Sequence, residues 1–274
     1  MNPYLKAVAI ALCLHARGAS AIAQQTPIEG SAEQILSEAS TEQKYTFLVF
    51  HRDDGPATQA MFQTVRRSVE SRPDQATLAF VDVTKSTNKA LIDRYDVGRA
   101  PMPLTLAVAP NGAITSLVPK KISAEQIEAA FVTPAAAFCM KSMQEGKFVF
   151  VCIQSAAKPV IPPGVKVFND DAEFKGRAVV ALIKSGDSAE AEFLEQLEIQ
   201  PNSKISTTVF LAPPGVLVGK FDAGATKDQL AGALHKAGKC CDDENCKHNK
   251  VSQPTSPRTP GSRQATQNSA TRRN

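Results

Sequence analysis

The sequence predicts an α/β protein made of two copies of one unit, each a mixed β-sheet flanked by helices. Four blocks recur in the same order at an offset of 101 to 103 residues, which indicates an internal duplication. Within each copy, strand and helix patterns alternate before a strand hairpin and a last helix. The matching blocks are residues 44–50 with 146–151, 76–97 with 177–199, 103–114 with 206–217, and 123–131 with 226–234.

The first half of each copy predicts two strands and two helices. In copy one, an apolar strand at 45–50 leads into a connection that contains a helix. A second strand follows at 78–83, and its high apolar content favours burial on both faces. Residues 86–97 then predict a helix with Ser86 or Thr87 as its N-cap.

The second half of each copy predicts a strand hairpin and a closing helix. Pro-Asn-Gly at 110–112 and Pro-Pro-Gly at 213–215 lie between apolar strands, as hairpin turns do. Ser123 and Thr226 precede the closing helices and are suited to N-cap positions. The expected order is therefore β-α-β-α-β-β-α in both copies.

This order resembles the thioredoxin fold, and two local features strengthen the resemblance. In thioredoxins the first strand leads into a Trp-Cys-Gly-Pro-Cys turn that opens a helix, and residues 53–57, Asp-Asp-Gly-Pro-Ala, fall on those five positions. Thioredoxins also have a cis-proline just before the third strand, and Pro103 lies there, nine residues before Gly112. Copy two has Ser206 at the matching position.

The resemblance implies a tandem pair of thioredoxin-like domains over residues 31–237. We expect five segments: a signal peptide at 1–23, domain 1 at 24–134, domain 2 at 135–238, a Cys/His-rich segment at 239–250, and a disordered polar tail at 251–274.

Neither copy contains the sulfur chemistry of thioredoxins. Thiol–disulfide exchange needs a thiolate, normally at a helix N-terminus where the thiol pKa is lowered. Copy one has Asp54, Gly55, Pro56 and Ala57 in this turn, and copy two has no Cys in its turn at residues 153–164. Catalytically silent thioredoxin-like domains of disulfide isomerase relatives serve as binding modules, so the resemblance implies a protein-binding or scaffold role without reductase activity.

Asp53 and Asp54 also admit a second interpretation, a paired-carboxylate site for acid–base work or a cation, with His51 beside it. Adjacent carboxylates on a turn are more typical of a solvated helix start. We therefore interpret the turn as a helix cap on an abandoned reactive site. The sequence contains no Ser-His-Asp pattern, phosphate-binding glycine loop or HExxH segment.

The first 23 residues predict export to the periplasm or outside the cell. Lys6 gives a positive start, residues 7–14 form a short apolar core, and Ala-Ile-Ala at 21–23 is a small-x-small cleavage site before Gln24. No later stretch reaches the about 20 apolar residues of a membrane span.

The net charge of +4 does not indicate a nucleic-acid-binding surface. Two basic residues lie in the predicted signal and four arginines in the polar tail, so the remainder has a charge near −2. We therefore expect partners to be other proteins or peptides rather than nucleic acid.

Cys139 and Cys152 are predicted to be two buried thiols rather than a disulfide. Cys139 lies about 9 Å along a helix from the intervening turn and Cys152 about 16 Å along a strand. The two positions are therefore out of step by about 7 Å before any lateral separation is added. A disulfide needs Cα atoms within about 7 Å in total. A lone-cysteine peroxidase would instead need an exposed Cys152 of low pKa, which its apolar strand disfavours.

A cluster of possible ligands follows the last helix. Cys240, Cys241, Cys246 and His248 fall within nine residues, and such donors suit zinc or copper. A small disulfide from Cys240 or Cys241 to Cys246, or a reactive thiol cluster, explains the same pattern. The alternative function is therefore a metal-binding or thiol-redox protein that uses this segment.

Overall fold

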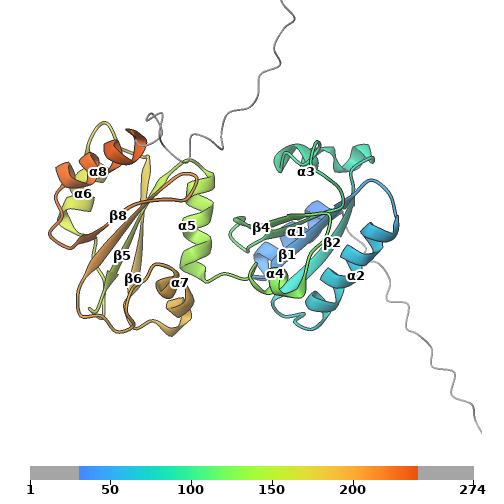
Figure 1. Cartoon of the computed structure of the whole chain (residues 1–274), viewed down its shortest axis with the longest axis horizontal. Coiled ribbons are helices and arrows are strands. Elements are labelled where there is room, and N and C mark those ends of the chain that lie inside the picture. Colours follow the sequence, from blue (N-terminus) through green and yellow to red (C-terminus); the bar gives the residue numbers. More distant parts are fainter. Residues whose placement is uncertain (1–30, 240–274) are drawn as a thin grey trace, which may run out of the picture.

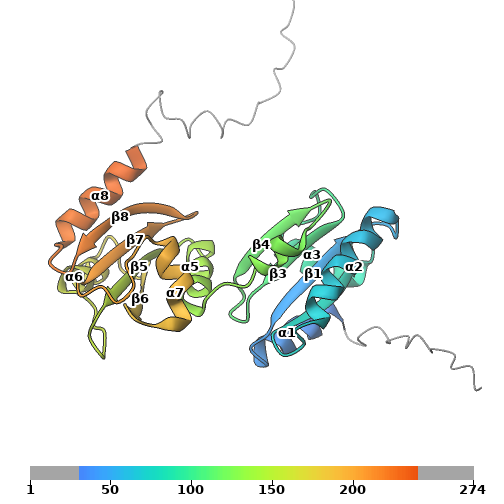
Figure 2. The same cartoon turned by 60° about the horizontal axis from the view of Figure 1, so that its bottom comes forward.

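A computed structural model describes residues 31–239 of the chain. The expected export signal, the Cys/His-rich cluster and the polar tail lie outside the described residues. Within the described span two α/β domains lie side by side (Figures 1 and 2), and each holds a four-stranded mixed sheet between helices. This confirms the expected fold class and the duplication.

Domain 1 has the sheet order β2-β1-β3-β4. Strand β1 is parallel to β2 and antiparallel to β3, and β3 forms an antiparallel hairpin with β4. Its elements are α1 (Ala32–Thr41), β1 (Tyr45–His51), α2 (Pro56–Glu70), β2 (Ala76–Asp82), the 3-10 turn η1 (Ser86–Asn88), α3 (Lys89–Arg94), β3 (Leu104–Val108), β4 (Ile114–Pro119) and α4 (Ala124–Glu128).

Domain 2 repeats this topology with the order β6-β5-β7-β8. The parallel pair is β5 and β6, and the hairpin is β7 and β8. Its elements are α5 (Pro134–Gln144), β5 (Phe148–Gln154), α6 (Pro163–Asp170), β6 (Ala178–Lys184), η2 (Ser188–Glu190), α7 (Ala191–Gln196), β7 (Thr207–Ala212), β8 (Val216–Asp222) and α8 (Lys227–Lys239).

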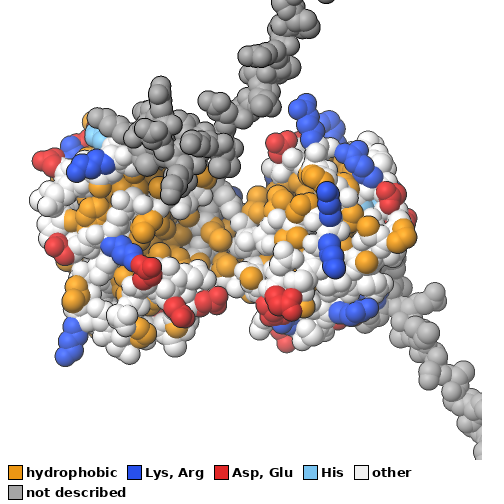
Figure 3. Space-filling model, in the orientation of Figure 1, with side chains coloured by type: hydrophobic (Ala, Val, Ile, Leu, Met, Phe, Trp, Pro, Cys, Tyr) orange, Lys and Arg blue, Asp and Glu red, His pale blue; other side chains and the backbone are white. Residues whose placement is uncertain are grey.

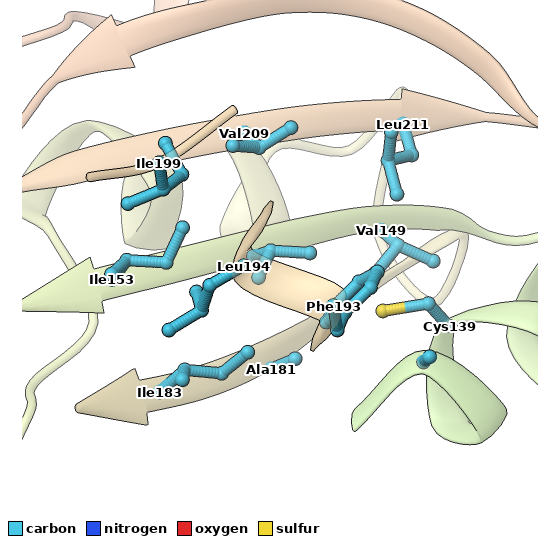
Figure 4. Close-up of a cluster of buried hydrophobic side chains, with 12 residues drawn as sticks. Cys139, Val149, Ile153, Ala181, Ile183, Phe193, Leu194, Ile199, Val209 and Leu211 are labelled. Atoms are coloured by element: carbon cyan, nitrogen blue, oxygen red, sulfur yellow. The ribbon is translucent and has the colours of Figure 1, made fainter. Parts of the chain in front are cut away.

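Each sheet has a buried apolar cluster on both faces. In domain 1, α1 and α3 cover one face and α2 and α4 cover the other. In domain 2, α5 and α7 cover one face and α6 and α8 cover the other. The cluster under α5 and α7 is shown in Figure 4.

Several local expectations are confirmed and others are wrong. Ser123 and Thr226 cap their helices, each accepting a hydrogen bond from the N–H group three residues later. Neither Ser86 nor Thr87 is an N-cap, because the chain first forms η1 and α3 begins after Asn88. A helix also precedes the first strand of each copy, which the expected order omits.

The expected burial of the second strand on both faces is also wrong. Strands β2 and β6 each pair on one side only and form an edge of their sheets. Phe80 of β2 and Leu182 of β6 are 37% and 43% exposed.

Helix α5 joins the two domains and is apolar on two sides. Its Cys139 packs into the sheet of domain 2, whereas Ala137 packs against Ala113 of domain 1. The side chain of Gln144 accepts a hydrogen bond from the N–H of Ile114 (2.9 Å) and donates one to the Ile114 carbonyl (2.7 Å). In Figure 3, apolar side chains gather on both sides of this junction.

Candidate functional site

The turn that corresponds to the thioredoxin reactive site lies at the carboxyl end of β1. His51 ends this strand and Pro56 opens α2. The Met102–Pro103 peptide bond is cis, and the next residue, Leu104, pairs with Phe50 of β1. Pro103 therefore lies beside the turn at the same edge of the sheet.

The carboxylates of this turn do not cap the helix, so the interpretation as a helix cap is wrong. The N-cap residue of α2 is Gly55, and no side chain accepts a hydrogen bond there. The Asp53 carboxylate instead accepts a hydrogen bond from the Gly55 N–H at 2.8 Å, which closes a tight Asx turn before the helix. Pro56 is the first helical residue, and both it and Ala57 are exposed.

His51 is buried and is held between Phe80 and the turn. Its ring stacks on Phe80 with centroids 3.9 Å apart. Its Nδ1 lies 3.2 Å from the Asp53 carbonyl and 3.5 Å from the Asp54 carboxylate. The two neighbouring carboxylates thus take part in separate contacts, since Asp53 binds the backbone and Asp54 faces His51.

Asp82, at the end of β2, is another acidic residue at this edge. The hydroxyl and the N–H of Thr84 both donate to its carboxylate, at 2.7 and 2.9 Å, and lower the pKa of Asp82. The charges of His51 and Lys85 lower this pKa further. Across residues 31–239, no group of three or more His, Cys, Asp or Glu side chains is arranged to hold a metal ion.

The same edge of domain 2 is formed around Gln154, the last residue of β5. Its buried side-chain amide donates to the Val160 carbonyl at 2.6 Å and accepts from the Val160 N–H at 2.9 Å. These two bonds fix the loop that leads to α6. They leave Val160 and Ile161 with 64% and 43% of their surface exposed.

Ile205 lies at the same edge, in the segment that leads into β7. It lies two residues before Thr207, which pairs with Ile153 next to Gln154. With 71% exposed, Ile205 is the most exposed large apolar side chain of the described residues. This surface is not among the sites predicted from the sequence, although the Val-Ile pair within a proline-rich loop is a signal for it.

Both described cysteines are free, buried thiols, as expected, and they lie on opposite faces of the domain 2 sheet. Burial raises the pKa of the Cys139 thiol to about 12, and the negative charge of Glu190 adds to the rise. Burial also raises the pKa of the Cys152 thiol to about 11, against a smaller lowering by the Thr208 hydroxyl. Figure 4 shows the Cys139 sulfur directed toward Phe193 and Val149. The lone-cysteine peroxidase interpretation is therefore wrong for Cys152.

The predicted ligands Cys240, Cys241, Cys246 and His248 lie outside the described residues. Between residues 31 and 239, every helix is too short or too polar to cross a membrane.

No family model matches the sequence. The search of curated proteins found no significant match either. Among solved structures, human ERp44 is 10% identical, with 75% of this chain and 56% of ERp44 covered at a TM-score of 0.33. This chain therefore spans little more than half the length of ERp44.

This chain aligns with nearly the whole length of two other solved structures. The first two thioredoxin domains of Saccharomyces cerevisiae Eps1p are 11% identical, with 72% of this chain and 90% of that one covered and a TM-score of 0.30. The NTD_N/C domain of the alkylhydroperoxide reductase AhpF from Enterococcus faecalis is 16% identical, with 75% and 100% covered and a TM-score of 0.26.

The fold assignment rests on the topology itself. Both sheets have a parallel pair made by a helical crossover, an antiparallel hairpin on the other side of the central strand, and helices on both faces. The chain is therefore a tandem pair of domains that each have the thioredoxin-like fold.

Proposed function

We propose that the protein is an exported polypeptide-binding module whose two domains carry out no thiol–disulfide exchange. One observation carries this proposal. At the sheet edge where a thioredoxin has its reactive turn, neither domain has a thiol, and domain 2 presents apolar side chains to solvent instead. Exposed apolar groups gathered at one place are typical of a surface that contacts another protein.

The two described thiols support the redox part of the proposal. A thiolate is the nucleophile of disulfide exchange, and a pKa of about 11 leaves about one Cys152 in ten thousand ionised at pH 7. Cys139, with a pKa of about 12, is ionised still less. Both sulfurs are also closed to a disulfide substrate, because the residues are buried.

Export is supported by the pattern of residues 1–23, with its basic start, apolar core and small-x-small site. An export compartment would place the binding edge among unfolded or partly folded secreted chains. A fusion of residues 1–30 to a reporter that is active only outside the cytoplasm tests this part, and a reporter retained in the cytoplasm contradicts it.

Insulin reduction and polypeptide binding test the function directly. The purified protein should not accelerate insulin reduction by dithiothreitol beyond a variant in which all cysteines are replaced by serine. It should bind fluorescent reduced, carboxymethylated α-lactalbumin saturably, because that chain is permanently unfolded. Insulin reduction above the cysteine-free variant contradicts the proposal, as does the absence of any binding to the unfolded chain.

A second variant tests the alternative function, in which the C-terminal segment binds a metal or carries out thiol-redox chemistry. Cys240→Ser, Cys241→Ser and Cys246→Ser remove its thiols and leave the described domains unchanged in sequence. Activity that this variant loses, or a metal that it no longer contains by elemental analysis, belongs to the segment and favours a metal-binding or thiol-redox protein.

A further inference from the structure

We infer that the carboxyl edge of the domain 2 sheet binds polypeptide segments in which apolar residues are flanked by acidic ones. We call this edge the domain 2 surface and define it by Val160, Ile161 and Ile205 with Lys158, Lys184 and Lys204. It is the place where the proposed polypeptide binding occurs, so the inference depends on that function.

The lysines of the domain 2 surface lie close to its apolar residues in the sequence or in the strand register. Lys184 ends β6 and pairs in register with Gln154, whose side chain holds Val160. Lys158 lies two residues before Val160 in the same loop, and Lys204 directly precedes Ile205. Positive charge therefore accompanies the apolar residues at the end of β6, in the loop before α6 and in the segment before β7.

These three lysines are exposed, and no ion pair in the described part of the chain includes any of them. The nearest acidic residue along the chain after Lys184 is Asp187, and its carboxylate accepts a hydrogen bond from the Ala189 N–H at 3.0 Å. The edge thus carries positive charge without a partner, although the chain outside the signal and tail is slightly acidic. Acidic groups on a partner would supply the missing counter-charges.

The apolar residues are preorganised for contact. Val160 is held by its two hydrogen bonds with Gln154. The N–H of Ile205 donates to the Ser203 hydroxyl at 3.2 Å, which fixes the backbone on the other side. Because valine and isoleucine are already restricted at χ1, immobilising them in a complex costs little entropy.

The composition of this edge favours a polypeptide over a lipid bilayer. Surfaces that insert into the membrane interface are rich in Trp, Tyr and Phe beside their basic residues. None of the residues that define the domain 2 surface is aromatic. Stiff β-branched side chains in a hydrogen-bonded loop are better suited to a shaped protein contact than to a fluid interface.

A labelled peptide tests the inference on the purified protein. The probe is a fluorescein-labelled ten-residue peptide with an Ile-Val-Ile-Val centre between Glu residues, and its counterpart has Lys in place of Glu. Fluorescence anisotropy should show that the acidic peptide binds at least about tenfold more tightly than the basic one, because the surface is positive. Equal binding of the two peptides overturns the charge argument.

Two variants assign the binding to the domain 2 surface. Lys158→Glu, Lys184→Glu and Lys204→Glu together should raise the Kd for the acidic peptide at least about tenfold, and so should Val160→Ser, Ile161→Ser and Ile205→Ser. The control for the charge variant changes three exposed lysines elsewhere, with Lys120→Glu, Lys121→Glu and Lys175→Glu. The control for the apolar variant changes two exposed leucines, with Leu117→Ser and Leu217→Ser. Circular dichroism confirms that every variant is folded.

Other occupants give different results. Co-sedimentation with vesicles containing one third anionic lipid, lost in the lysine variant, overturns the inference in favour of a membrane surface. Concentration-dependent dimerisation that the same variant abolishes overturns it in favour of a second copy of this chain. If carboxymethylated α-lactalbumin binds all variants equally, the inference fails and the proposed function stands, whereas failure to bind any probe removes both.

Discussion

The carboxylate of Glu190 accepts a hydrogen bond from the N–H of Ala135 at 2.9 Å, across 55 residues of sequence. Glu190 is buried at the end of η2, and Ala135 lies in the first turn of α5. A negative charge at a helix N-terminus satisfies a free N–H group and interacts favourably with the helix dipole. This contact therefore fastens η2 and α7 to the helix that joins the two domains.

Removal of this carboxylate should destabilise domain 2. We expect Glu190→Ala to lower the free energy of unfolding by about 1–3 kcal/mol, because the half-buried Ala135 N–H loses its acceptor. Glu190→Gln keeps an acceptor oxygen and loses only the charge, so it should cost less. Urea unfolding followed by circular dichroism measures both, and equal losses in the two variants would show that the hydrogen bond is not the reason.

Gly164 is required by the close approach of α6 to the start of α8. A Cβ atom at this position would lie 1.9 Å from the Ala225 carbonyl oxygen. Gly164→Ala should therefore lower the free energy of unfolding by about 2 kcal/mol or more, since the obstacle is backbone and cannot rotate away.

Gly232 supplies the matched control for Gly164. It lies inside α8, and a Cβ atom there would meet no atom within 4 Å. Gly232→Ala should stabilise the protein by up to about 1 kcal/mol through helix propensity. Thermal unfolding of both variants tests the pair, and a loss of stability in Gly232→Ala would show that the space beside α8 is not open.

The topology of each domain could be predicted because it depends on local patterns that the duplication shows twice. Ser123 and Thr226 identify helix starts, since a capping side chain acts within three residues. The alternation around Cys152 identifies a buried strand face for the same local reason. Edge position is different: the apolar run of β2 matches that of a central strand, and only the crossover places it at an edge.

The candidate site could be predicted only in part. The turn of domain 1 was recognisable because its glycine and proline remain, but the partners of Asp53 and Asp54 depend on side-chain rotamers. The domain 2 surface was missed because Val160 and Ile205 lie 45 residues apart in sequence. Their common position follows from the pairing of β5 with β7, which no local pattern records.

The buried thiols should make stability fall at alkaline pH. The folded-state pKa is about 12 for Cys139 and about 11 for Cys152, above the ordinary value of 9.0 that applies to the unfolded chain. Below pH 9 the two thiols are protonated in both the folded and the unfolded state, so their contribution to stability is fully present there. Above it the unfolded state alone releases the protons, and stability falls by about 1.4 kcal/mol per pH unit for each thiol until the folded pKa is reached.

Urea unfolding at pH 8, 9.5 and 10.5 measures this decline. A variant with Cys139→Ala and Cys152→Ala should lose stability less steeply, because it retains only the other alkaline groups, such as Tyr45 and Tyr95. Parallel declines in the two proteins would contradict the raised thiol pKa values.

Gln154 should control the order of the loop that carries Val160. Gln154→Leu removes both side-chain hydrogen bonds to the Val160 backbone, so the Val160 amide should exchange its hydrogen at least about tenfold faster. Gln154→Glu keeps an acceptor for the Val160 N–H and loses the donor, and its exchange rate should be intermediate. The amide of Val151 in the middle of β5 is the reference and should be unaffected. If Val160 exchanges at the same rate in all three proteins, the loop is ordered by other contacts, and the preorganisation assigned to the domain 2 surface has no basis.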